Sequence, residues 1–103
     1  MLLIELKRFQ EAKALFRKVV PVARRVSGEG DENTLRLRMI YAQVLYYDPD
    51  ATPDDVREAV TALEDVERIA RRVFGGAHPL VKSIELELRI SRAKLRAHET
   101  PSS

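Results

Sequence analysis

Two stretches of the sequence, Ala23-Arg24-Arg25-Val26-Ser27-Gly28 and Ala70-Arg71-Arg72-Val73-Phe74-Gly75, lie 47 residues apart and differ at one position. Glu11-Ala12 returns as Glu58-Ala59 at the same offset, and Val19 returns as Val66. Self-similarity at a fixed period is typical of repeat arrays, whose units cannot bury their apolar faces alone and therefore stack. The duplication predicts an array of similar units.

Apolar residues around both stretches recur at steps of three and four, which is the helical period. Glycines and prolines separate these periodic segments, and Thr52-Pro53-Asp54-Asp55 has the pattern of a capped helix start. We expect no strands and one domain over residues 1–97, followed by a polar disordered tail over 98–103. The helices are expected at about 2–7, 9–27, 33–47, 54–74 and 78–97.

Three motifs resemble the tetratricopeptide repeat (TPR) family, and specifically its kinesin-light-chain-like subtype. Lys7-Arg8-Phe9-Gln10-Glu11-Ala12 resembles the start of the second helix of a repeat, with Lys7 in place of Gly. Gly75-Gly76-Ala77-His78-Pro79-Leu80-Val81 resembles the end of a repeat, with Val81 in place of Thr. Tyr41-Ala42 resembles the Leu-Ala pair of a first helix.

The resemblance implies an all-α fold, a right-handed solenoid of antiparallel helix pairs with about two and a half repeats. Residues 48–55 would then be a lengthened loop within one helix pair. In this family the first helix of each pair lines the inside of the superhelix. The resemblance therefore implies a non-catalytic interaction module or scaffold, which binds a peptide segment of a protein partner on its concave groove.

Aligning Tyr41-Ala42 with the family pair places four residues on the concave surface: Arg36, Met39, Gln43 and Tyr46. They offer charge, adaptable apolar contact, an amide and an aromatic anchor. The alternative for Met39 and Tyr46 is packing in the core. A second candidate site is a basic ridge formed by the last turns of two equivalent helices: Arg24, Arg25, Arg71 and Arg72. These arginines either complement the helix dipoles or hold an acidic peptide.

Charge is segregated along the 103 residues, although the net charge is only +2. Residues 1–30 carry seven basic and three acidic side chains, residues 31–67 three and ten, and residues 68–103 eight and three. In a stacked array, a basic end of one molecule could meet the acidic middle of another. One alternative function is therefore a structural subunit that stacks through its open repeat ends, by self-association or within a larger complex. A nucleic-acid binder that uses the basic ridge is a less favoured alternative, because no base-stacking aromatics are interleaved with the basic residues.

The chain contains no Cys, which excludes disulfides, zinc fingers of the cysteine type and a thiol nucleophile. His78 and His98 are its only imidazoles, and they have no metal-ligand spacing. We expect no enzyme activity, no cofactor and no metal. No run of about 18 apolar residues is present, so no membrane span is expected, and the cytoplasm is the default location.

Overall fold

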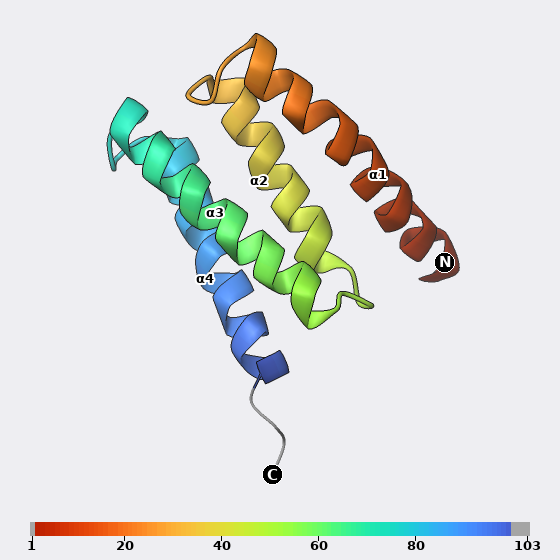
Figure 1. The fold of residues 1–103 in the computed structure, drawn as a ribbon. Helices are drawn as coiled ribbons and strands as arrows, with labels where there is room; N and C mark the ends of the chain where they lie inside the picture. Colours follow the sequence, from red (N-terminus) through yellow and green to blue (C-terminus); the bar gives the residue numbers. More distant parts are fainter. Residues whose placement is uncertain (1, 100–103) are drawn as a thin grey trace.

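The structure is a computed structural model that describes residues 2–99, with the side chains of residues 8–99. It contains α1 (Leu2–Val26), α2 (Glu32–Tyr47), α3 (Pro53–Phe74) and α4 (Pro79–Glu99). No strand occurs within residues 2–99, which confirms the expected all-α class. Figure 1 shows α1, α2 and α3 running antiparallel in order, with α4 behind α3.

The first helix differs from the expectation of two helices over residues 2–7 and 9–27. Residues Leu2–Val26 form one continuous helix, which also passes through Pro21. The physical reason lies at Lys7 and Arg8, which are good helix formers where a break would need Gly or Pro. The prediction of a separate helix end before Phe9 was therefore wrong.

The last helix also differs from the expectation. His98 and Glu99 were assigned to a disordered tail, but they belong to α4. Arg57 on α3 donates a hydrogen bond from Nε to Glu99 Oε2 over 3.2 Å, which holds this last turn against α3. The remaining tail residues, 100–103, lie outside the described residues.

Local sequence signals set the helix ends. The Asp31 side chain accepts hydrogen bonds from the backbone N–H groups of Asn33 and Thr34 and caps α2. Thr52 and Asp55 form the expected capping box of α3, with Pro53 in the first turn. Gly75 ends α3 with a φ of 86°, in the left-handed region that favours glycine.

The main core lies between α2, α3 and α4. Residues from the facing sides of these helices are fully or almost fully buried, and they include Leu35, Ala42, Leu45, Val56, Leu63, Val66, Ile84 and Leu88. Helix α2 packs against all three other helices, whereas α1 packs against α2 alone within the described residues. Helix α1 is therefore the outermost element, as Figure 1 also shows.

Candidate functional site

The four residues expected on the concave groove divide into an open and a covered set. Arg36 is exposed and forms an ion pair with Glu32 over 2.7 Å, and Gln43 is half-buried. Met39 is half-buried and packs against the core. Tyr46 is only 2% exposed. The alignment thus misplaced Tyr46, because its side chain belongs to the core and not to an open surface.

Tyr46 is part of a buried polar cluster that joins α2 to α4. Its hydroxyl donates a hydrogen bond to Glu87 Oε1, and the Tyr47 hydroxyl bonds to Glu87 Oε1 at 2.9 Å and Oε2 at 3.2 Å. The two tyrosine rings meet edge to face, with 4.7 Å between centroids. Burial and the hydrogen bond to Glu87 raise the pKa of Tyr46 well above its usual range, and the same two causes raise the pKa of Tyr47.

Tyr47 takes the exposed position that the sequence analysis gave to Tyr46. Its side chain is 49% exposed, although its hydroxyl is fixed by Glu87. On α2, Tyr47 continues a face with Arg36, Ile40 and Gln43, at helical steps of four, three and four. Ile40 is also exposed.

Helix α4 meets α2 at Glu87 and exposes apolar residues of its own. Leu86 and Ile90, one turn apart, are both partly exposed and flank Glu87 in sequence. We call the combined set the α2–α4 surface: Arg36, Ile40, Gln43, Tyr47, Leu86 and Ile90. It comprises exposed apolar side chains on both helices, one aromatic ring whose hydroxyl is fixed by Glu87, an arginine and an amide.

The basic ridge is partly used within the molecule. Arg24 Nε bonds to both carboxylate oxygens of Glu29 at 2.9 and 2.8 Å, and Arg71 bonds to Glu85. Arg25 and Arg72 are exposed and have no acidic partner within 4.0 Å among the described residues. Two of the four expected ridge residues therefore hold their own fold together, which leaves a weaker basic feature than the sequence indicated.

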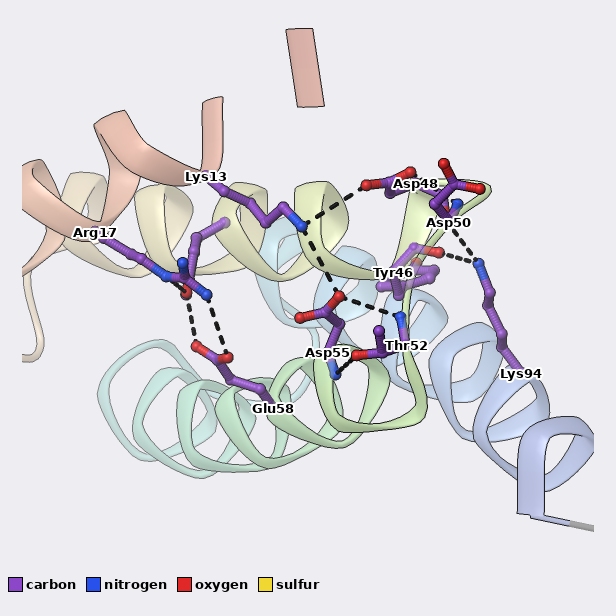
Figure 2. Close-up of polar contacts among 10 residues, drawn as sticks. Lys13, Arg17, Tyr46, Asp48, Asp50, Thr52, Asp55, Glu58 and Lys94 are labelled. Carbon is purple, nitrogen blue, oxygen red and sulfur yellow. Dashed lines mark hydrogen bonds and ion pairs between the residues drawn. The ribbon is translucent and has the colours of Figure 1, made fainter. Parts of the chain in front are cut away.

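A loop clamp, made of Lys13, Asp48, Asp55 and Lys94, fixes the α2–α3 loop (Figure 2). Lys13 Nζ lies 3.7 Å from Asp48 Oδ2 and 3.8 Å from Asp55 Oδ2, and both Lys13 and Asp48 are buried. On the opposite side, Lys94 donates to the Tyr46 carbonyl oxygen and, at 3.4 Å, to the Asp48 carbonyl oxygen. The loop is thus tied to both α1 and α4.

Two further polar links join α2 to α3. Tyr41 accepts a hydrogen bond from Arg17 Nε at 3.0 Å and donates one to Glu58 Oε2 at 2.6 Å. Arg38 is buried and donates to Asp65 Oδ2 at 2.8 Å. Burial alone would raise the pKa of Asp65, but the hydrogen bond and charge of Arg38 outweigh it, so this pKa lies below its usual value.

Three further features concern His78, metal binding and membrane-spanning helices. The His78 side chain accepts the Leu80 N–H at 3.1 Å and so serves the start of α4. Among the described side chains of residues 8–99, no three His, Asp or Glu gather so that they could hold a metal ion. Within the same range no helix is long and apolar enough to cross a membrane.

Comparison with known proteins gives one match. No curated protein and no solved structure matches the chain. A family model described as tetratricopeptide repeat matches residues 1–33, which span α1 and the turn that follows it. Together with the all-helical fold, this match supports a relationship of the chain to the TPR family.

Proposed function

We propose that this protein is a non-catalytic interaction module, which binds an extended or helical segment of a protein partner along the α2–α4 surface. TPR repeats generally mediate protein–protein interactions and typically act as non-catalytic scaffolds. We further propose that the repeats are of the kinesin-light-chain type, on the basis of the Gly75-Gly76-Ala77-His78-Pro79 motif.

One observation carries the proposed binding surface: Tyr47 is half exposed, yet its hydroxyl is held by Glu87 of the neighbouring helix. Aromatic side chains are enriched among the residues that dominate binding energy. A ring that is already fixed loses little rotamer freedom when a partner covers it, so binding is not weakened by that entropy cost. Tyr47 is therefore suited to be the central anchor.

The neighbours of Tyr47 suit a peptide rather than a small molecule. Ile40, Leu86 and Ile90 offer shallow apolar contact spread over two helices. Among the described residues, Arg36 is held by an exposed ion pair with Glu32 alone, which contributes little and can exchange for a peptide carboxylate. The side-chain amide of Gln43 can form hydrogen bonds with the backbone of a peptide. The members on α2, from Arg36 to Tyr47, lie along one line of that helix, as an elongated ligand requires.

The test begins with selection of binding peptides from a random displayed library against the 103-residue chain. A selected peptide is then titrated into ¹⁵N-labelled protein, and we expect the shifted amides to lie on α2 and α4 around Tyr47. Tyr47→Ala should lower the affinity for the peptide by roughly 30-fold, which is the effect of losing a strong interface anchor. Val73→Ala is the matched control, because Val73 is equally exposed but lies at the end of α3.

Two outcomes would contradict the proposed surface. One is a Tyr47→Ala variant with a wild-type circular dichroism spectrum and unchanged affinity for the peptide. The other is a set of shifted amides confined to helices other than α2 and α4.

A further inference from the structure

Helix α1 carries two apolar faces, and α2 covers only one of them. Phe16 and Val20 belong to the covered face, where the Phe16 ring lies 6.4 Å from that of Tyr41. The second face follows steps of three and four along the helix: Ala12, Leu15, Val19, Val22 and Val26. Three of its large residues are open to solvent, since Leu15 is 58%, Val22 46% and Val26 74% exposed, whereas Val19 is half-buried.

A hollow adjoins this second face. Arg8, Phe9 and Ala12 of α1 and Val44 of α2 line it, and its volume is about 440 Å³. The second face and the hollow together form an apolar trough on α1, bounded on one side by α2. Contiguous exposed apolar surface of this kind marks a place where another protein packs.

The internal repeat shows what kind of element fits the trough. At the offset of 47 residues, Ala12, Val19 and Val22 correspond to Ala59, Val66 and Ile69 of α3. Those three residues are buried in the core between the helices that pack on α3. Helix α3 packs closely against α2 and α4, whereas within the described residues α1 packs closely against α2 alone and reaches α3 through the Lys13–Asp55 and Arg17–Glu58 ion pairs. The face that a neighbouring helix covers on α3 is thus uncovered on α1, so the missing element is a helix.

The charge beside the trough selects the helix. Lys18 and Arg25 directly precede Val19 and Val26, which places them along the edge of the apolar face. Together with Arg8 they have no acidic partner within 4.0 Å among the described residues, in contrast to Arg17 and Arg24. In packed helix pairs, residues at such flanking positions set partner choice through opposite charges.

A second copy of this chain is a poor occupant. Residues 8–26 of α1 carry six basic and one acidic side chain, and α4 carries five basic and three. Either end helix of a second copy would therefore meet α1 with like charge. Helix α3 is more acidic, but Val73 is the only large apolar residue that it exposes. Within the described residues, no helix offers a face that is both apolar and acidic.

We propose that the trough on α1 binds an amphipathic helix of a partner protein, with acidic residues flanking its apolar seam. This interaction is independent of peptide binding on the α2–α4 surface. It adds a helix to the outer side of α1, in the way that neighbouring helices cover α3.

The test uses the whole chain and two synthetic peptides of about three heptads. Both peptides have Leu at the two seam positions and differ only in having Glu or Lys at the flanking positions. We expect the Glu peptide to bind at least tenfold more tightly by fluorescence anisotropy, and its affinity to fall as salt rises. The double variant Leu15→Ser/Val22→Ser should abolish binding, whereas Leu86→Ser/Ile90→Ser, on the α2–α4 surface, should not.

A charge-reversed variant provides the decisive comparison. Lys18→Glu/Arg25→Glu should prefer the Lys peptide, because only the sign of the flanking charge has changed. Equal binding of the two peptides, or binding of neither, would overturn the proposal. Sedimentation equilibrium tests whether a second copy of this chain occupies the trough. A wild-type dimer that dissociates in the Leu15→Ser/Val22→Ser variant would show that it does, and this result would also overturn the proposal.

Discussion

At the scale of single residues, the structure assigns opposite roles to two adjacent tyrosines. Tyr46 is a core residue and Tyr47 is half exposed, although both hydroxyls bond to Glu87. Successive residues on a helix point about 100° apart, so an alignment error of one position exchanges a core residue for a surface residue. The two roles can be separated by measuring stability and binding on the same variants.

Tyr46→Ala should destabilise the fold by about 3–5 kcal/mol, because it leaves a large cavity in the core and removes one partner of a buried carboxylate. Tyr47→Ala should cost about 1 kcal/mol or less, since much of its ring is already in water. Urea unfolding followed by circular dichroism measures both. Equal losses of stability would contradict this division of roles.

The ion pair between Arg38 and Asp65 should make stability depend on pH. The pKa of Asp65 is lower in the folded protein than in the unfolded chain, so its contribution is complete above the unfolded pKa of about 4. The contribution is lost as the pH falls through the folded pKa. Asp65→Asn should therefore destabilise the protein at about pH 7 and have a smaller effect at about pH 3.

Urea midpoints of the wild type and of Asp65→Asn at the two pH values check this expectation. Glu32→Gln is a suitable control, because its ion pair with Arg36 is exposed on both sides. If the difference in stability between the wild type and Asp65→Asn grew as the pH fell, the expected direction of the pH dependence would be wrong.

At the scale of secondary-structure elements, short-range signals determine where the helices begin. Helix α3 is the clearest case, because Thr52 and Asp55 cap it reciprocally and Pro53 occupies its first turn. The same Asp55 carboxylate lies 3.8 Å from Lys13 Nζ, so the cap is also part of the loop clamp. Local capping and tertiary packing therefore depend on one side chain.

Thr52→Ala should destabilise the protein by about 1 kcal/mol, the usual effect of losing an N-cap hydroxyl. Thr61→Ala is the matched control, because Thr61 is exposed in the interior of the same helix and should change stability by less than about 0.5 kcal/mol. Thermal unfolding of the two variants distinguishes them. A Thr61→Ala variant that loses as much stability would indicate that the cap has no special role.

These elements also show what the sequence could and could not predict. The caps at Asp31 and Thr52 and the helix end at Gly75 were predictable, because each depends on residues within one turn. The continuity of α1 was not, because the family pattern suggested a break that Lys7 and Arg8 do not make. The burial of Glu87 was also not predictable, because its tyrosine partners lie 40 and 41 residues away in the sequence.

At the scale of the whole molecule, the helices have unequal numbers of neighbours. Helix α2 packs closely with the other three and α3 and α4 pack closely with two each. Within the described residues, α1 packs closely with α2 alone and reaches α3 through the ion pairs of Lys13 and Arg17. In a repeat array, stability is approximately a sum of unit and nearest-neighbour terms, so the outermost helix is the least stabilised. The right-handed path and the count of about two and a half repeats stay predictions.

Amide hydrogen exchange should therefore be fastest in α1 and slowest in α2 and α3. Mass spectrometry of peptic fragments gives the protection of each helix. Bound acidic-flanked peptide should slow exchange in α1, because an added helix supplies its second neighbour. Protection of α1 equal to that of α3 in the free protein would contradict the ranking.

The loop clamp has a mechanical consequence. Within the described residues, helices α1 and α4 do not pack against each other, yet Lys13 and Lys94 reach the same short loop from opposite sides. Tension applied to those two helices would be transmitted through Asp48 and its backbone as well as through the apolar packing on α2. The loop therefore acts as a tie between the two ends of the molecule, and stretching should break the contacts of Lys13 and Lys94 before it separates α2 from α3.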